Sequence, residues 1–189
     1  MNTVQAQLSV IIPSAGASER LGQPKQLVKY RGKALIQRAI DNAASLEPQE
    51  ILVVTGANAE AVQTTVQMNT AKFVYNTDWE NGLGASIACG ARASDAESTG
   101  ILITLCDQWL VSAGDLHQLL STWQANPEKI VCSETGSRCG PPAIFPVSCF
   151  KELRNLKGDH GAHSIIEAHP DLLMPVTLLN AASDLDTPS

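Results

Sequence analysis

Residues 8–25 carry the sequence LSVIIPSAGASERLGQPK, which decides the fold class. The apolar run from Leu8 to Ile12 has the β-branched composition of a buried strand. The small residues after it lie where an α/β sheet places its ligands, at the carboxyl end of the first strand. Small side chains let backbone N–H groups approach a phosphate chain, and Arg20 and Lys25 add positive charge. The stretch therefore predicts a strand followed by an anion-binding loop.

Neither standard phosphate-loop pattern describes this loop. A Walker loop needs its Lys directly after the second Gly, whereas Lys25 comes three positions after Gly22. A Gly-x-Gly-x-x-Gly dinucleotide pattern is absent from residues 8–25 as well. On spacing alone, an ordinary exposed turn with two solvated cations therefore remains open.

Outward from this loop, short β-branched runs alternate with stretches of helical period, which indicates βα units around a mostly parallel sheet. Strands are expected at 8–12, 50–55, 72–75, 101–105, 129–132 and 174–178. Helices are expected at 34–46, near 59–68, near 86–93 and from about 113 to 124, with two short ones before the final strand. The turn-rich residues 134–142 lead into apolar residues 143–145, which predicts an antiparallel excursion in the last third.

Composition limits the classes of partner. The 189 residues are 44% hydrophobic and 17% charged, which predicts one globular domain over 1–189. A net charge of −6 argues against a broad nucleic-acid or anionic-membrane footprint, so a polyanionic ligand must meet a local basic cluster. No apolar run approaches a membrane span and no leader is evident, so we expect a cytoplasmic protein. Five cysteines without Cys-x-x-Cys spacing are expected to be reduced and mostly buried.

The loop closely resembles the signature of the molybdenum cofactor nucleotidyltransferases, Leu-Ala-Ala-Gly-x-Ser-x-Arg-Met/Leu-Gly-x-x-Lys. The matching residues are Ala15, Gly16, Ser18, Arg20, Leu21, Gly22 and Lys25. Pro13-Ser14 stands where the family usually has Leu-Ala. The resemblance implies a Rossmann-like three-layer nucleotidyltransferase fold. It also implies a nucleotide-binding loop made of Ala15, Gly16, Ala17, Ser18, Glu19, Arg20, Leu21, Gly22 and Lys25.

Further family features follow in order along nearly the whole chain. They are the Asn-Trp-Gly loop at 76–87, the strand ending in Asp107-Gln108, Gly-Pro-Pro at 140–142, Gly-Asp-x-Gly-Ala at 158–162 and Asp-x-Asp-Thr-Pro at 184–188. Trp109 replaces the proline of the family's Asp-Gln-Pro. The last two features resemble the cytidylyl-transferring subgroup. The resemblance thus implies Mg²⁺-dependent transfer of CMP from CTP, favoured over GTP, to the phosphate of molybdopterin or the molybdenum cofactor, with release of pyrophosphate.

The resemblance also implies roles for single residues. Lys25, Arg20 and Asp107 are the catalytic candidates, and Asp107 with Asp186 would hold Mg²⁺. A helix cap is the alternative for Asp107, and without the family Asp184-Leu185-Asp186 is only an acidic chain end. Acceptor contacts are expected from Trp79, Ser86 and Asp159. For each of these three a structural role stays open, namely packing for Trp79, a helix N-cap for Ser86 and a turn cap for Asp159.

Two other functions compete with this one. A sugar-phosphate or methylerythritol-phosphate nucleotidyltransferase would share the fold and the loop, but it would leave the Gly-Asp-x-Gly-Ala and Asp-x-Asp-Thr-Pro features unexplained. A non-catalytic partner that binds nucleotide or cofactor is favoured by the departures at Pro13-Ser14 and Trp109. The partner expected downstream of the reaction is a molybdoenzyme or its chaperone.

Overall fold

The computed structural model describes residues 7–17, 23–67 and 71–182 of the chain. Its strands are β1 (Leu8–Ser14), β2 (Lys29–Tyr30), β3 (Lys33–Ala34), β4 (Glu50–Thr55), β5 (Ala71–Tyr75), β6 (Gly100–Ile103), β7 (Ile130–Thr135), β8 (Arg138–Pro146) and β9 (Leu173–Thr177). Its α-helices are α1 (Leu35–Ala44), α2 (Ala59–Thr65), α3 (Gly82–Ala93), α4 (Ala113–Ala125), α5 (Phe150–Leu153) and α6 (His163–Ala168).

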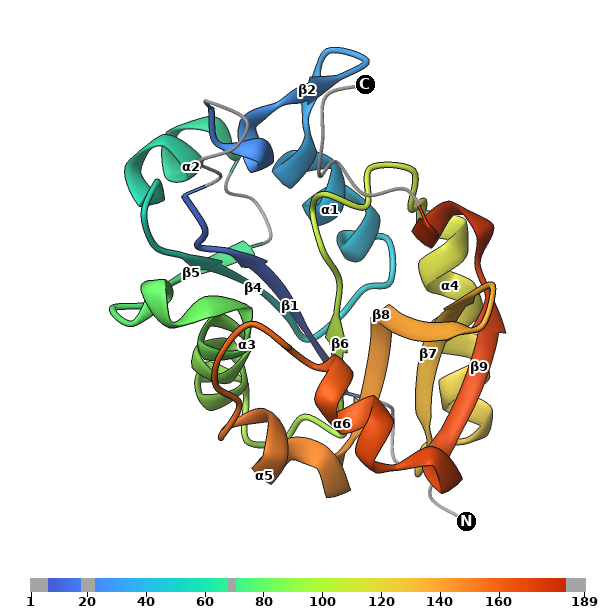
Figure 1. The fold of residues 1–189 in the computed structure, drawn as a ribbon. Coiled ribbons are helices and arrows are strands. Elements are labelled where there is room, and N and C mark those ends of the chain that lie inside the picture. The colour runs from blue at the N-terminus through green and yellow to red at the C-terminus, as the bar shows by residue number, and fades with distance from the viewer. Residues whose placement is uncertain (1–6, 18–22, 68–70, 183–189) are drawn as a thin grey trace.

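The described strands form a seven-stranded sheet in the order β5-β4-β1-β6-β8-β7-β9, and β2 pairs with β3 in a separate hairpin. Every neighbouring pair in the large sheet is parallel except the two pairs that contain β8. The predicted α/β class and its antiparallel excursion in the C-terminal third are therefore confirmed. The β2–β3 hairpin projects beyond the carboxyl ends of the parallel strands (Figure 1).

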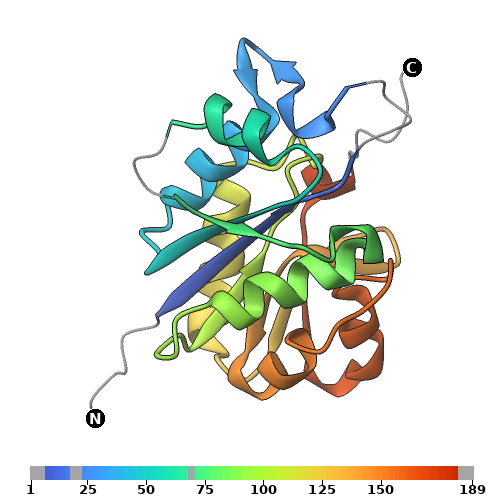
Figure 2. The same cartoon turned by 90° about the vertical axis from the view of Figure 1, so that its left-hand side faces the viewer.

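Helices cover both faces of the sheet and give three layers. Helices α1 and α4 lie on one face, and α3, α5 and α6 lie on the other (Figures 1 and 2). Each face has its own apolar cluster, because strand side chains point alternately to the two sides. Val10 and Ile12 of β1 pack toward α1, whereas Ile11 between them packs toward α3. The side chains of Val10, Ile11 and Ile12 are all fully buried, as expected for a strand whose sheet is covered on both faces.

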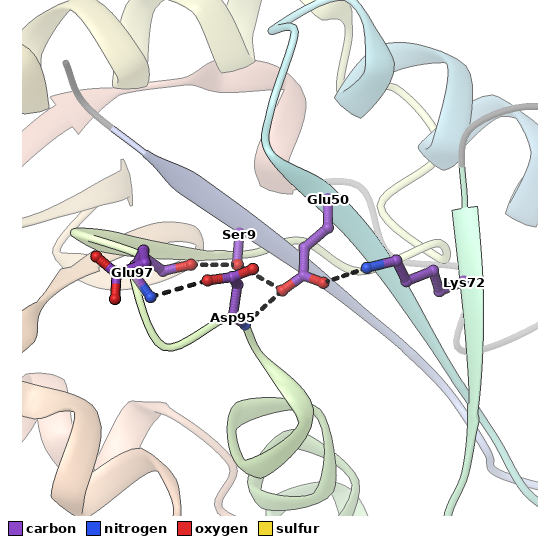
Figure 3. Close-up of polar contacts among 6 residues, drawn as sticks. Ser9, Glu50, Lys72, Asp95 and Glu97 are labelled. Atoms are coloured by element: carbon purple, nitrogen blue, oxygen red, sulfur yellow. Dashed lines mark hydrogen bonds and ion pairs between the residues drawn. The ribbon is translucent and has the colours of Figure 1, made fainter.

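The Glu50 carboxylate is buried at the amino-terminal end of the central strands (Figure 3). Glu50 Oε1 accepts hydrogen bonds from Ser9 Oγ at 2.8 Å and from the Asp95 backbone N–H at 2.6 Å. Its other oxygen pairs with Lys72 Nζ at 3.1 Å. Ser9 and Glu50 are also register partners of β1 and β4. Since an unpaired buried charge is costly, these partners explain how a carboxylate is tolerated at this end of the sheet.

Most element boundaries differ by one to three residues from the sequence prediction, and two differ by more. Helix α3 begins at Gly82, four residues before the predicted start. Glycine has a low helix propensity, so the sequence pattern placed Gly82 and Gly84 outside the helix. In the structure both glycines pack closely against Gly158. Strand β8 begins at Arg138, inside the stretch predicted to be a turn. The turn is only Gly136-Ser137, where Gly136 has a φ of 64°, and the strands resume on both sides of it.

Other parts of the sequence prediction match the described residues. Strand β4 has the predicted bounds, and α1 buries Leu35, Ile36, Ile40 and Ala43 on one stripe. The five cysteines are free thiols, three buried and two partly exposed. Among the described residues, no helix is both long enough and apolar enough to cross a bilayer.

Candidate functional site

The site is built where the strand order reverses. Strand β1 lies between β4 and β6, so the chain leaves β1 toward one edge of the sheet and later returns on its other side. In open α/β sheets, ligands bind at the carboxyl ends of the strands next to such a switch point. Residues 15–17, directly after β1, and Asp107, shortly after β6, both lie at this position. Residues 15–17, the described start of the loop predicted to bind phosphates, are therefore at the ligand-binding edge of the sheet.

Lys25 and Asp107 meet at this edge. Lys25 begins a short 3₁₀ helix, Lys25–Leu27, and its Nζ forms an ion pair with Asp107 Oδ2. The Lys25 side chain is 31% exposed and that of Asp107 is 14% exposed. The pair joins two of the three predicted catalytic residues across 82 positions of sequence. Its partial exposure leaves both charges within reach of an incoming ligand.

Gln26 fixes the start of the loop, a role that sequence reasoning missed. Its side chain is 1% exposed, and Nε2 donates to the carbonyl oxygens of Ser14 at 3.2 Å and Gly16 at 3.3 Å. The segment that carries Lys25 is thereby tied to the backbone that follows β1. The available sequence signal was the Gln-Leu pair directly after the loop lysine.

The amino-terminal end of α3 brings two predicted acceptor residues close to the site. The Trp79 side chain packs on Gly56, where an added Cβ would lie 2.6 Å from Trp79 Cβ and 2.8 Å from the Ala15 carbonyl oxygen. Asp159 lies against Gly82, where an added Cβ would be 2.2 Å from Asp159 Oδ1. Gly82 also has a φ of 88°, which favours glycine at this position. A carboxylate at a helix N-terminus is stabilised by the helix dipole.

Ser86 has a different environment from the other two. It lies in the second turn of α3 and is 4% exposed. Its Oγ accepts a hydrogen bond from Asn76 Nδ2 at 3.2 Å, and Asn76 Oδ1 accepts one from the Asp78 backbone N–H at 3.0 Å. The N-cap position of α3 belongs to Asn81. Ser86 thus fixes the loop that leads to Trp79, from within the protein interior.

A large concavity, which no sequence pattern indicated, opens beside Asp107. Its volume is about 1120 Å³, and it is bounded by the β7–β8 hairpin, α6 and the two residues that flank the Cys106-Asp107 pair. The lining residues include Leu105, Gln108, Arg138, Cys139, His163 and Glu167. Gln108 is held in one wall of the concavity, because its Nε2 donates hydrogen bonds to the carbonyl oxygens of Pro141 at 2.8 Å and Ala181 at 3.0 Å.

The thiol next to Asp107 is not a reactive group. Cys106 is 6% exposed. Burial, together with the neighbouring Asp107 carboxylate, raises the pKa of the Cys106 thiol to about 12. A thiol with so high a pKa stays protonated near neutral pH and is a poor nucleophile. Cys106 therefore belongs to the core, as its position in the sequence predicted.

The remaining predicted site residues lie outside the described residues. They are Ser18, Glu19, Arg20, Leu21 and Gly22 of the loop and Asp186 of the predicted metal pair. Within 7–17, 23–67 and 71–182, no group of three or more His, Cys, Asp or Glu side chains is arranged to hold a metal ion. Asp107 is thus the described carboxylate at the switch point.

The sequence of most of the chain decides its family. Residues 10–172 match the model of the MobA-like NTP transferase domain. The chain belongs to this family. The MobA-like family assignment identifies the chain as a nucleotidyltransferase.

Relatives of the MobA-like chain carry several names. Nicotine blue oxidoreductase from Paenarthrobacter nicotinovorans is 29% identical over 188 residues, covering 94% of this chain and 91% of that protein. Purine catabolism protein PucB from Bacillus subtilis strain 168 is 27% identical over 164 residues, covering 82% and 78%. The crystal structure of Rv0371c from Mycobacterium tuberculosis H37Rv matches with a TM-score of 0.86 and 26% identity, covering 97% and 94%. A complex of that protein with manganese matches with a TM-score of 0.77 at 23% identity, covering 91% and 88%.

Proposed function

We propose that the chain transfers CMP from CTP to the phosphate of molybdopterin or the molybdenum cofactor, with release of pyrophosphate. One observation carries the proposal: Lys25 and Asp107 form an ion pair at the carboxyl ends of β1 and β6, beside the phosphate loop. Transfer of a nucleotidyl group needs a cation to neutralise the triphosphate and a carboxylate to hold a divalent metal ion beside it. The preference for CTP rests on the resemblance of residues 158–162 and 184–188 to the cytidylyl-transferring subgroup.

The reaction needs no covalent enzyme intermediate. An oxygen of the acceptor phosphate attacks the α-phosphorus of CTP, a new P–O bond forms, and the bond to the departing pyrophosphate breaks in line with it. The loop after β1, held by Gln26, places the triphosphate, and Lys25 with Arg20 neutralises its negative charge. Because Lys25 is paired with Asp107 in this structure, we expect it to turn toward the phosphates when nucleotide binds.

The donor set at the switch point fits Mg²⁺. Mg²⁺ is held in proteins through one or two carboxylates together with substrate phosphates, and it does not need an all-protein cage. The Asp107 carboxylate is mostly buried beside the loop that would hold those phosphates, and Asp186 is the proposed second ligand. When bound, the ion would neutralise charge on the α-phosphate. The manganese complex of Rv0371c supports a divalent cation in this fold.

The acceptor would approach from the side of Asp107 that faces the concavity. The concavity is bounded by Leu105 and Gln108, which flank the Cys106-Asp107 pair. Arg138 on its wall suits an anionic acceptor. Trp79 and Asp159 lie on the α3 side of the same sheet edge and are the proposed further contacts. Which side holds the pterin is decided by comparing Arg138→Ala with Trp79→Ala for their effect on the acceptor KM.

The test is pyrophosphate release with each of four nucleoside triphosphates, with and without purified molybdenum cofactor, in Mg²⁺ and in chelator. We expect release only with acceptor and metal, and fastest with CTP. A preference for GTP would overturn the assignment to the cytidylyl subgroup but keep the family. Tight CTP binding without pyrophosphate release would indicate a binding partner in place of an enzyme.

The same assay includes the competing activities. Pyrophosphate release with a sugar phosphate or methylerythritol phosphate as acceptor would replace the proposal by the second nucleotidyltransferase function. A reduced nicotinamide nucleotide is added as a further arm, because one relative is named an oxidoreductase. Its oxidation by the purified chain, measured by absorbance without any nucleoside triphosphate, would contradict the proposed transfer reaction.

A further inference from the structure

An aromatic contact joins the two segments that carry the Lys25–Asp107 pair. The rings of Tyr30 and Trp109 meet edge to face, with centroids 4.6 Å apart and planes at 65°. Tyr30 lies in β2, five positions after Lys25, and Trp109 lies two positions after Asp107. We propose that Trp109, through its contact with Tyr30, is a positioning residue that holds Asp107 opposite Lys25. Trp109 is the position at which this chain departs from the proline of the family's Asp-Gln-Pro.

Helix α1 also contacts Tyr30 and Trp109. The Arg38 guanidinium lies 5.0 Å from the Tyr30 ring centroid, and Nη2 donates to the Trp109 carbonyl oxygen at 3.5 Å. One turn later, Asn42 Nδ2 donates to the Val111 carbonyl oxygen at 2.8 Å. Arg38 therefore contacts both partners of the aromatic pair, while Asn42 fixes the backbone beyond it.

Gln108, the residue between Asp107 and Trp109, is attached to other parts of the fold. Gln108, which is 7% exposed, donates to the carbonyl oxygens of Pro141 and Ala181. Asp107 thus comes directly before a residue anchored toward β8, and Trp109 anchors the next position toward β2 and α1. With the Trp109 ring removed, the loop keeps the Gln108 anchor and the backbone hydrogen bonds to α1, but it loses its ring contact with β2. Such a loop can still fold but no longer fixes the carboxylate relative to the β2–β3 hairpin.

The alternative is that the pair only packs the hairpin onto the body of the protein. A packing role predicts a lower melting temperature and an unchanged Lys25–Asp107 pair in the molecules that remain folded. A positioning role predicts that Lys25 becomes more accessible and that turnover falls even at a temperature where the protein is folded. An edge-to-face contact is worth about threefold to tenfold in an equilibrium.

The first measurement does not depend on any activity. Lysine acylation by acetic anhydride is followed by peptide mass spectrometry on the full chain, and the Lys25 rate is divided by that of the exposed Lys151 in the same sample. We expect Trp109→Ala to raise this ratio about threefold to tenfold. Trp109→Phe should restore most of the protection because it keeps a ring. Tyr75→Ala, which removes a ring that is 57% exposed, is the matched control and should leave the ratio unchanged.

The second measurement rests on the proposed function. In the pyrophosphate assay, Trp109→Ala should lower kcat about tenfold with a smaller change in nucleotide KM, because positioning acts on the reacting geometry. Tyr30→Leu should have the same effect, and the double variant should be little worse than either single one. If Trp109→Ala does not fold, Tyr30→Leu tests the contact from the hairpin. Absence of turnover in the parent chain would contradict the proposed function and leave the acylation result standing.

An unchanged acylation ratio in folded Trp109→Ala or Tyr30→Leu would overturn the inference. A raised ratio in both Trp109→Ala and Trp109→Phe would also count against it, because the edge contact would then not be the cause.

Discussion

Replacement of Gln26 by Met tests whether the loop after β1 is held by side-chain hydrogen bonds. Methionine has a similar length and fills the same buried space, but it cannot donate to the Ser14 and Gly16 carbonyl oxygens. Each neutral hydrogen bond contributes a net ~1 kcal/mol, and a buried carbonyl left without its donor adds to the cost. We therefore expect a loss of ~2 kcal/mol in the free energy of unfolding. For a chain of this size, that corresponds to a decrease of ~4–8 °C in Tm.

Thermal melts in the absence of nucleotide measure the loss of stability. Calorimetry measures the affinity for nucleotide, and we expect the Kd for CTP to be ~10-fold higher, since 1.4 kcal/mol corresponds to a factor of ten. Gln118→Met on the exposed face of α4 is the matched control and should change neither quantity. If Gln26→Met melts within the ~0.5 kcal/mol range of a neutral surface substitution, the two bonds do not stabilise the loop and the reasoning is refuted.

Three further outcomes are expected. Lys25→Ala should lower turnover by ~10²-fold or more, the scale for removing one preorganised charge-stabilising group, and unchanged kinetics would mean that the loop is structural. Asp107→Asn and Asp186→Asn should each abolish most activity, with the double variant little worse than either. Normal turnover of Asp186→Asn at low Mg²⁺ would exclude Asp186 as a ligand. Burial raises the pKa of the Cys106 thiol to about 12, so iodoacetamide should leave this thiol unmodified in the native protein through pH 9. Iodoacetamide should label Cys106 only when the protein unfolds. Rapid labelling of the native protein would contradict the burial of Cys106.

Local pattern determined most of the secondary structure. The β-branched run of β4 and the apolar stripe of α1 each have one structural solution, because the periods of strand and helix decide which side chains are buried. The sequence pattern predicted the start of α3 wrongly, because glycines occupy the first turn of this helix. Glycines at the start of α3 disfavour a helix locally, yet Gly84 donates its N–H to the Gly158 carbonyl oxygen at 2.8 Å, a contact from 74 positions further along the chain.

The candidate site divides in a similar way. The loop from Ala15 to Lys25 and the carboxylate at Asp107 were identifiable because each directly follows or lies near the end of an apolar strand. The concavity beside Asp107 was not, since it is formed by the β7–β8 hairpin, α6 and the end of β6 together. Arg138 on its wall had been predicted to lie in a turn, and the pairing of β8 with β7 places it in a strand instead.

By itself, the sequence determined that strands alternate with helices, that a loop of small residues and cations follows the first strand, and that most of the chain resembles one nucleotidyltransferase family. Only the tertiary structure decided that Lys25 pairs with Asp107, that Gln26 ties the loop down and that Trp109 meets Tyr30. The physical reason is the range of the forces involved. Periodicity and turn chemistry act over a few neighbouring residues, whereas the Lys25–Asp107 and Tyr30–Trp109 contacts depend on the order of the strands, which brings segments about 80 positions apart to the same edge of the sheet.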